Sequence, residues 1–205
     1  MLSIREYSEA ECAVFHRVRD TFGPFSNMAS GYGFQIGDVA VLSSEHHYQA
    51  MRFPHRPDIQ EQILAVKSPI KAKRKAYEFI SQTREDWHRV NIPIMRHCIQ
   101  LRHAFNAVRL QPLYDQSADM PIVEKSLRDD FWGAKPIGSG RLRGVNALGR
   151  LHMGHRLELR NDPDFCVLTV APPEIPDYRL LDRKIEVVDV PRINSAKGWQ
   201  TSLDL

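Results

Sequence analysis

The longest periodic pattern in the chain is the feature that most constrains its fold. From Thr83 onward, large apolar residues recur at steps of three and four positions, the spacing of one face of an α-helix. The stripe comprises Trp87, Val90, Ile94, Cys98, Leu101 and Phe105. Glu85 and Asp86 fall in the predicted first turn, where carboxylates suit the positive helix end. We therefore predict a long buried helix that begins near Thr83 and is kinked at Pro93.

Three shorter helices are predicted upstream of this one. Ser43 or Ser44 caps the first, which ends before a proline. The second begins at Asp58, with Glu61 completing a capping box, and the third begins with Pro69 in its first turn. The predicted ranges are 44–53, 58–66 and 69–79. A last helix, capped by Asn146 and ended by Asp162-Pro163, follows much later in the chain.

Short β-prone runs separate and follow the helices. Residues 34–42 predict a hairpin that turns at Gly37-Asp38, and residues 121–126 predict a short strand. A loop is expected around Pro112, and residues 129–144 are expected to be an irregular glycine-rich stretch. The mixture of long helices and few strands predicts a mainly helical α+β fold in a single domain, with a small β component.

The region after residue 160 has a different character from the helical part. Its apolar runs FCVLTV and KIEVVDV predict an accessory hairpin or an edge extension, and the end from Asn194 is expected to be loose. We predict an N-terminal extension over 1–21, a main domain over 22–160 and a β-prone extension over 161–205.

Composition excludes some classes of protein. A balance of 28 Lys+Arg against 25 Asp+Glu is too mildly basic for a protein that coats duplex nucleic acid. Three scattered cysteines predict reduced thiols in a cytoplasmic protein. No apolar run approaches the roughly 20 residues of a membrane helix, and we expect no membrane partner.

Several motifs that suggest chemistry have a simpler interpretation. The pairs His46-His47 and His152/His155 lack the HExxH spacing of a zinc helix, so no metal site is predicted. GSGR at Gly138 lacks the lysine and serine of a phosphate loop; a flexible flap over a ligand and a solvated loop stay open as alternatives. Cys98 belongs to the buried stripe rather than to a nucleophilic site.

A basic run and two carboxylates carry more information. Lys71, Lys73, Arg74 and Lys75 lie on one predicted helix, as a solvated face or as partners of a pyrophosphate. Glu45 precedes Gln49 by four residues, and Asp130 precedes Trp132 by two. Carboxylates combined with the indole rings of Trp87 and Trp132 suit cleavage of a sugar–base bond. In that reaction one carboxyl stabilises a developing oxocarbenium ion and the rings hold the base.

These motifs together resemble the NADAR family, also called YbiA-like, over about Phe22 to Arg160. The matching segments are FSN (25–27), SEHHYQAMRF (44–53), SPIKAK (68–73), REDW (84–87), IVEKS (122–126), DDFWGA (129–134) and GVNALGRLHMGHRLELR (144–160). The resemblance implies a YbiA-like fold and an N-glycosidase that acts on ribose-containing nucleotide conjugates without a cofactor.

The resemblance also implies the site residues. Catalytic roles fall on Glu45, Asp130 and Lys73. Substrate-binding roles fall on Ser26, Asn27, Gln49, Arg52, Trp87, Trp132, Gly133 and Asn146. Several members carry lysine where this chain has Arg52, and arginine cannot form an imine with an opened ribose because its guanidinium stays protonated. Either Lys73 forms such an imine or the reaction is direct hydrolysis, and the sequence leaves both open.

Within the family, QAMRF followed by Pro54 and the REDW and DDFWGAKP segments resemble the branch found beside DarT-type DNA ADP-ribosyltransferase toxins. That resemblance implies an antitoxin that removes ADP-ribose from guanine in DNA, RNA or a free nucleotide, with the cognate toxin as a further partner. Two alternatives are an N-glycosidase on phosphoribosylated riboflavin-pathway intermediates and a non-catalytic module that binds ADP-ribose or an NAD derivative. Glu45, Gln49 and Arg52 would share one helical stripe, the wall of the pocket.

Overall fold

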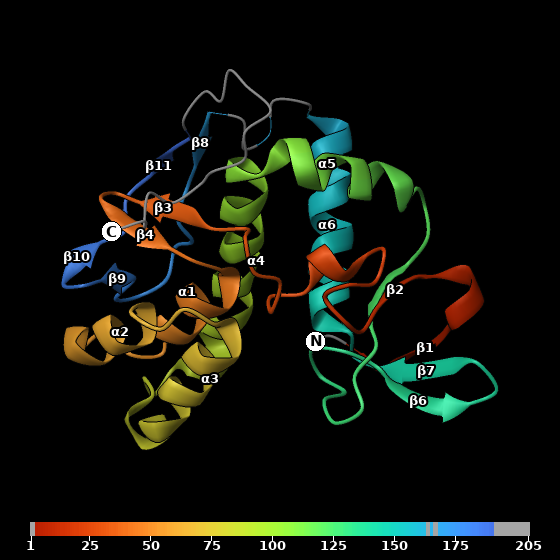
Figure 1. Cartoon of the computed structure of the whole chain (residues 1–205), viewed down its shortest axis with the longest axis horizontal. Coiled ribbons are helices and arrows are strands. Elements are labelled where there is room, and N and C mark those ends of the chain that lie inside the picture. Colours follow the sequence, from red (N-terminus) through yellow and green to blue (C-terminus); the bar gives the residue numbers. More distant parts are fainter. Residues whose placement is uncertain (1–2, 163–164, 166–167, 191–205) are drawn as a thin grey trace. The chain divides into compact units, whose positions relative to one another are not determined.

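The computed structural model describes residues 3–162, 165 and 168–190 (Figure 1). These residues form six α-helices and five small β-sheets, which confirms the mainly helical α+β class. The chain divides into two compact units: Met1–Ala29 with Leu110–Phe165, and Ser30–Arg109 with Cys166–Leu205. The division into an N-terminal extension, a main domain and a C-terminal extension, with boundaries at residues 21 and 160, stays a prediction. None of the described helices is long and apolar enough to cross a membrane.

The second unit is arranged around one short buried helix, α1 (Ser44–Ala50), which contacts α2, α3 and α4 (Figure 1). Their bounds are Pro57–Leu64, Pro69–Glu78 and Trp87–Phe105. The strands β3 (Phe34–Ile36) and β4 (Val39–Val41) form the predicted hairpin, with Gly37 at a φ of +59° in its turn. Ser43 caps α1 by accepting a hydrogen bond of 3.4 Å from the His46 N–H, as expected.

Two predicted helix starts are wrong, and both errors involve an arginine–aspartate pair. α2 begins at Pro57 without a capping box, because the Asp58 carboxylate binds Arg56 at 2.6 Å. α4 begins at Trp87 instead of Thr83. The segment before it is fixed outside the helix, because the Arg84 N–H donates to the Arg52 carbonyl at 2.9 Å and its side chain binds Asp86.

The apolar stripe of α4 is confirmed over most of its length. Five of its six predicted members are buried and Trp87 is half-buried. The buried members are Val90, Ile94, Cys98, Leu101 and Phe105. Pro93 lies inside the helix as predicted.

The chain beyond the last helix forms short strands that belong to the second unit. β8 (Thr169–Val170) pairs antiparallel with β11 (Val188–Asp189), and β9 (Arg179–Leu180) pairs with β10 (Arg183–Lys184). Of the two alternatives predicted for this region, a hairpin or an edge extension, the antiparallel pairing agrees with the hairpin. Cys12 and Cys98 are free thiols; Cys166 and the end from Asn194 lie outside the described residues.

The first unit contains a three-stranded sheet in the order β1-β7-β6. The strands are Arg5–Ser8, Arg141–Gly144 and Lys135–Gly138. The prediction of an irregular stretch over 129–144 is therefore wrong in its second half. Gly138 and Gly140, at φ of +92° and +67°, make a tight turn, and β7 alternates exposed and buried side chains because Leu142 faces a core shared with Tyr7. Ser8 of β1 pairs with Arg141 of β7, 133 positions later in the sequence, so local patterns did not reveal this pairing.

A parallel pair and a helix complete the first unit. β2 (Ala13–Phe15) pairs with β5 (Ile122–Glu124), the predicted strand, and α6 (Ala147–Asn161) packs on β5. α6 crosses β5 closely: a Cβ at Gly149 would lie 2.1 Å from the Ile122 carbonyl oxygen. His152 is a structural link there, bonded to the Tyr114 hydroxyl at 2.7 Å and to the Phe25 carbonyl at 2.9 Å.

The loop expected around Pro112 is instead part of α5 (Ala107–Gln116). A proline inside a helix removes one hydrogen bond and costs about 3 kcal/mol. Leu110 and Tyr114 lie one turn apart and are both buried. Burial of these two large side chains offsets that cost, which the sequence pattern alone did not indicate.

Candidate functional site

α1 is buried although its sequence, SEHHYQA, is mostly polar. All seven residues are buried, and burying polar groups is costly unless they are hydrogen-bonded. The Ser44 hydroxyl donates to the Cys98 carbonyl at 3.4 Å, and the His46 ring bonds to the Ser43 hydroxyl and the Val66 carbonyl, both at 2.8 Å. A helix that served packing alone would be apolar, so this polar helix is the candidate for the functional site.

Glu45, Gln49 and Arg52 form a hydrogen-bonded chain along α1 and its end. The Gln49 amide donates to Glu45 Oε1 at 2.8 Å, and Arg52 Nε donates to Gln49 Oε1 at 2.8 Å. The Glu45 side chain is almost wholly buried, at 4% exposed. The predicted stripe of these three residues is therefore present, with its members in direct contact.

The surroundings of the Glu45 carboxyl have opposing effects on its pKa. Burial raises the pKa of this carboxyl above its usual range, because the charged form loses its hydration. The hydrogen bond from Gln49 and the positive charges of Lys73 and Arg52 lower the pKa and so limit the rise. A carboxyl with these neighbours is suited to stabilising positive charge that develops in a reacting molecule.

Aromatic rings surround the Arg52 guanidinium. Its central carbon lies 4.3 Å from the ring centre of Trp87, 5.9 Å from that of Tyr48 and 5.8 Å from that of Tyr77. Arg52 Nε is held by Gln49, while its two terminal nitrogens make no hydrogen bond with any described residue. These donors are oriented and available, which is the arrangement that binds a phosphate or carboxylate.

Lys73 completes this group from the neighbouring helix α3. Lys73 is half-buried, and its ammonium lies 5.8 Å from the ring centre of Tyr77. Tyr77 itself is 51% exposed. Tyr48 and Tyr77 were missed in the sequence, although each stands four positions from a predicted site residue, Arg52 and Lys73. That spacing puts the side chains on one helical face and could have revealed both tyrosines.

The remaining predicted site residues belong to the first unit. The Asp130 carboxylate is exposed and binds the Lys135 ammonium at 3.0 Å, a hydrogen bond that holds the pKa of this carboxyl below its usual range. Trp132 is half-buried and meets the Phe131 ring edge-on at 5.2 Å between ring centres. Asp129 Oδ1 accepts the N–H groups of both aromatic residues and so fixes this loop.

Gly133 and Asn146 are tied to the strand β5. A Cβ at Gly133 would lie 2.6 Å from the Glu124 carbonyl oxygen, so only glycine fits there. Asn146 has a left-handed backbone, with a φ of +53°, and its side chain does not cap α6 as predicted. Instead its amide accepts from the Glu124 N–H at 3.1 Å and donates to the Ile122 carbonyl at 2.9 Å. Both amide atoms are used in joining α6 to β5; a substrate-binding role stays a prediction.

Ser26 and Asn27 lie where the chain leaves a short 3₁₀ turn over Gly23–Phe25. Both are buried. Ser26 Oγ accepts the Met28 N–H at 3.2 Å, which stabilises the turn locally. Their predicted contact with substrate is not tested by this geometry.

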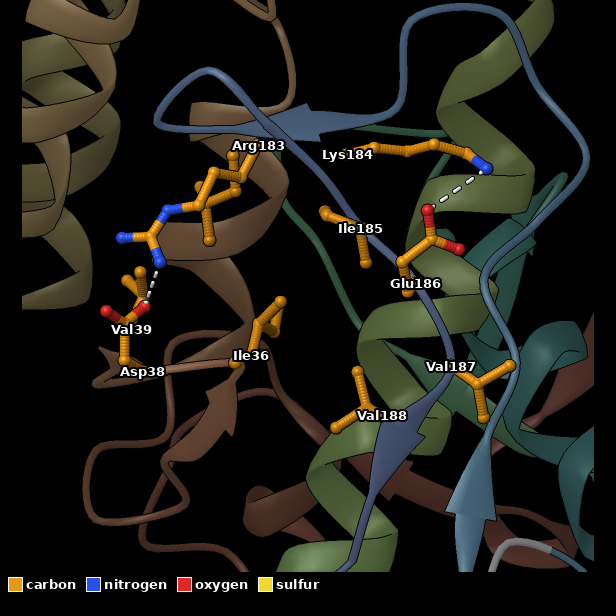
Figure 2. Close-up of a pocket in the computed structure, with 11 residues that line it drawn as sticks. Ile36, Asp38, Val39, Arg183, Lys184, Ile185, Glu186, Val187 and Val188 are labelled. Atoms are coloured by element: carbon orange, nitrogen blue, oxygen red, sulfur yellow. Dashed lines mark ion pairs between the residues drawn. The ribbon is translucent and has the colours of Figure 1, made fainter.

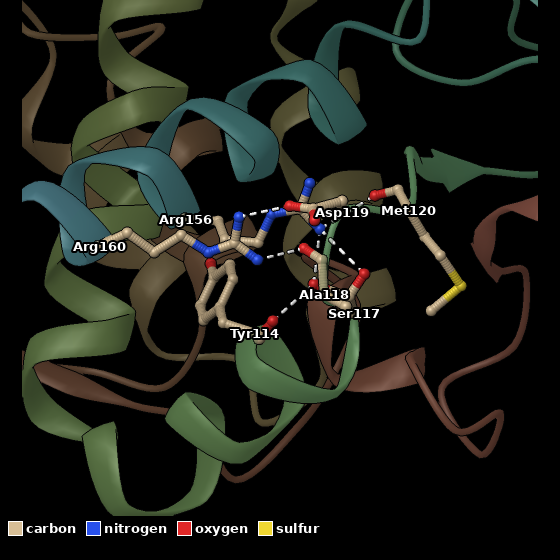
Figure 3. Close-up of polar contacts among 7 residues, drawn as sticks. All are labelled: Tyr114, Ser117, Ala118, Asp119, Met120, Arg156 and Arg160. Carbon is tan, nitrogen blue, oxygen red and sulfur yellow. Dashed lines mark hydrogen bonds and ion pairs between the residues drawn. The ribbon is translucent and has the colours of Figure 1, made fainter.

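Other arginines of the first unit are used in structural contacts (Figure 3). Arg156 donates to the Ser117 hydroxyl at 2.8 Å and to the Met120 carbonyl at 2.9 Å, and Arg160 binds Asp119 at 2.7 Å. Together they hold the turn between α5 and β5. Arg141, considered for a phosphate flap, pairs with Glu6 across the sheet at 2.6 Å.

A separate hollow of about 210 Å³ lies in the second unit, between the β3–β4 hairpin and the chain around β10 and β11, and Figure 2 shows the residues that line it. Ile36, Ile185 and Val188 give it an apolar lining, and an Asp38–Arg183 pair at 2.7 Å borders it. None of the predicted site residues lines this hollow, so the candidate site is the α1 group.

The pattern of the NADAR domain matches residues 14–160, which is most of the chain. The chain belongs to the NADAR family. The match includes every predicted site residue, and the NADAR residues described above, Glu45, Gln49, Arg52, Lys73 and Trp87, form one contiguous group in the second unit.

Two proteins similar to this chain give further comparisons. The solution structure of the Escherichia coli protein YbiA has 29% sequence identity and a TM-score of 0.61, covering 72% of this chain and 84% of YbiA. A protein of Vibrio vulnificus named riboflavin biosynthesis protein is 34% identical over 121 residues. That alignment covers 58% of this chain and only 30% of the Vibrio protein.

Proposed function

We propose that this NADAR protein is an N-glycosidase that hydrolyses the bond between a phosphorylated ribose and a nitrogen of its heterocycle or amine. The observation that carries the proposal is the buried Glu45 carboxyl, joined through Gln49 to an Arg52 guanidinium whose terminal donors are available. A carboxylate beside an anion-binding pair of cations suits a sugar phosphate that becomes positively charged at C1′.

In the proposed reaction, the C1′–N bond breaks and positive charge develops on the ribose, which the Glu45 carboxylate stabilises. The oxygen of water forms the new bond to C1′, and the protons of that water end on the new hydroxyl and on the leaving nitrogen. Arg52 and Lys73 bind the phosphate, and the indole of Trp87 keeps the guanidinium in place by stacking at 4.3 Å.

The first substrate candidate is a phosphoribosylated intermediate of the riboflavin pathway. Support comes from the similarity to the Vibrio protein named riboflavin biosynthesis protein, which is 34% identical over 121 residues. Arg52 and Lys73, the two cations whose charges act on Glu45, match one phosphate group. The similarity favours this metabolite over the DNA substrate that the sequence motifs suggested first.

The second candidate is ADP-ribose attached to guanine in DNA, with this protein as antitoxin to an ADP-ribosyltransferase. One observation favours it: the outer face of α3 exposes Lys71, Arg74 and Tyr77 next to the candidate site. Cations beside an exposed ring suit a single strand or flipped nucleotide, whose phosphates and bases need both. The catalytic role of Asp130 and the substrate-binding roles of Trp132 and Asn146 stay predictions of the family resemblance.

Lys73 allows a covalent variant of the mechanism. Its amine would attack the C1′ of the opened ribose, release the base and form an imine that water then hydrolyses. Borohydride would trap that imine as a stable adduct on Lys73, detectable by mass spectrometry. Direct hydrolysis leaves no adduct and tolerates Lys73→Arg, whereas the imine route does not.

The experiment that tests the proposal presents both conjugates to the purified protein in parallel. Release of ribose 5-phosphate from a phosphoribosylated amine supports the first candidate, and release of ADP-ribose from a modified guanine oligonucleotide supports the second. Tight binding of ADP-ribose with no turnover of either conjugate would contradict the enzymatic proposal and support a non-catalytic binding module.

A further inference from the structure

The segment Pro176 to Leu181 belongs to the second unit, lies outside the NADAR match, and is hydrogen-bonded to α1, α2 and the segment that precedes α4. Its central residue is Tyr178, a buried tyrosine whose hydroxyl lies between two buried imidazoles. The hydroxyl is 2.8 Å from His47 Nε2 on α1 and 2.7 Å from His97 Nδ1 on α4. A hydroxyl has one proton, so it donates to one ring and accepts the N–H of the other.

This cluster is unusual for a core that only packs. Burial lowers the pKa of both His47 and His97, so both rings are neutral. Each ring also buries a second nitrogen, His47 Nδ1 and His97 Nε2, for which the described residues offer no hydrogen-bond partner. Such nitrogens are costly to bury, and an apolar trio of the same size would avoid that cost. What the polar trio provides instead is directional: two short bonds fix the orientation of α1 against α4.

Two further connections tie the same segment to the end of α1. The Gln60 amide donates to the Ala50 carbonyl at 3.2 Å and to the Arg179 carbonyl at 3.0 Å, while its oxygen accepts the Leu181 N–H at 2.7 Å. Gln60 is fully buried, so these bonds are shielded from water. It therefore links the helix end to the segment.

The third connection runs through Arg84. Its guanidinium donates to the Pro176 carbonyl at 2.6 Å and to the Asp177 carbonyl at 3.3 Å. Its backbone N–H binds the Arg52 carbonyl at 2.9 Å. The segment is thus connected to His47 directly, to Ala50 through Gln60, and to the candidate site residue Arg52 through Arg84.

We infer that Pro176–Leu181 is a positioning segment that fixes α1 from behind, and that Tyr178 is the positioning residue at its centre. This deepens the proposed function, since the residues it orients are those proposed to break the glycosidic bond. A displacement of α1 by a fraction of an ångström would move Glu45 relative to a bound ribose and slow the reaction.

The test compares Tyr178→Phe with a matched control, Tyr114→Phe. Both changes remove one buried hydroxyl that bonds to a histidine, but Tyr114 bonds to His152 in the first unit. Two measurements are made on each folded variant. Steady-state kinetics gives kcat and KM for the conjugate that the wild type cleaves, and ¹³C NMR of the Glu45 carboxyl gives its pKa. The Glu45 signal is assigned by its absence in Glu45→Gln.

Tyr178→Phe is expected to lower kcat about tenfold with KM changed by less than about threefold, as a misplaced catalytic group does. It should also move the pKa of Glu45 toward its ordinary value, because α1 becomes less firmly buried. Tyr114→Phe should change neither quantity. Equal kcat values and an unmoved Glu45 signal in Tyr178→Phe would overturn the inference.

The NMR measurement keeps this inference separate from the proposed function. If the wild type cleaves neither conjugate, the proposed function fails. The effect of Tyr178→Phe on the pKa of Glu45, measured by NMR, then tests the positioning segment independently. If Tyr178→Phe does not fold, Gln60→Met takes its place, since it removes the link to Ala50 while keeping side-chain volume. A Gln60→Met variant with an unmoved Glu45 signal would also contradict the inference.

Discussion

Glu45 Oε1 accepts a hydrogen bond of 2.8 Å from the Gln49 amide, one helical turn later on a helix buried on every side. This bond favours the charged form of a carboxyl that burial would otherwise keep neutral. The same Gln49 holds Arg52 through its oxygen, so one amide sets the distance between the acidic group and the proposed phosphate site. The account of function depends on this small network.

The buried Glu45 carboxyl predicts a specific effect of pH on stability. Its pKa is raised by folding, so the folded protein holds a proton that the unfolded chain has lost, and stability falls as pH rises between the two pKa values. Glu45→Gln removes this penalty and should be more stable than the wild type at pH 7. The gain should vanish below the ordinary pKa of glutamate, about 4.3. Urea unfolding of both proteins at several pH values measures it; an equal difference at every pH would contradict the assignment.

The neutral histidines around Tyr178 predict the opposite trend in mild acid. Burial lowers the pKa of His97 to about 3, so below about pH 6.5 the unfolded chain binds a proton that the folded protein does not. Stability is therefore fully present above that pH and is lost as pH falls. The loss from His97 should reach about 2 kcal/mol at pH 5. His97→Asn, which can keep a bond to Tyr178, should show a shallower decline; an unchanged slope in urea unfolding would refute this.

Arg52 should tolerate substitution poorly, because its charge and its shape both matter. Arg52→Ala should raise KM roughly tenfold or more, since a hydrogen bond to a charged group contributes about 1.5–3 kcal/mol. Arg52→Lys keeps the charge but loses the bond to Gln49 and the stacking on Trp87, and should fall between the wild type and alanine. Steady-state kinetics separates the cases. A lysine variant as active as the wild type would leave only charge as its role.

The sequence predicted the helical part well because helix signals are local. The stripe of α4 and the Ser43 cap depend on residues within a few positions of one another, and both are confirmed. The hairpin of β6 and β7 was missed, because its stability depends on β1, far away in the chain. The start of α4 was likewise predicted too early. The Arg84 N–H is bonded to the Arg52 carbonyl instead of joining the helix, and no local pattern reveals that partner.

The candidate site was predictable where it followed one helix. Glu45, Gln49 and Arg52 were expected on one stripe from their spacing, and they form a bonded chain. The ring of Tyr77 and the buried hydroxyl of Tyr178 come from other elements, so nothing in the spacing along α1 pointed to them. Asn146 was expected to cap α6 with its side chain. Instead its amide bonds to the strand β5, whose position depends on long-range pairing that the local sequence does not reveal.

Asp130 offers a test of catalysis that stability cannot confuse. Its carboxylate is exposed, and among the described residues it pairs with the Lys135 side chain, a kind of ion pair that contributes little to folding. Asp130→Asn should therefore unfold like the wild type in urea. If Asp130 is catalytic, as the family resemblance implies, the same variant should lose activity by about a hundredfold or more. Full activity in the folded variant would remove Asp130 from the proposed mechanism.

The most direct test of the account is single-turnover release of the base by Glu45→Gln, which has nearly the same shape as the wild type. With protein in excess over a phosphoribosylated amine or a modified guanine oligonucleotide, the wild type should release the free base. The variant, shown to be folded by its NMR spectrum, should do so at least about a hundredfold more slowly. Release by folded Glu45→Gln at the wild-type rate would contradict the claim that this carboxylate breaks the glycosidic bond.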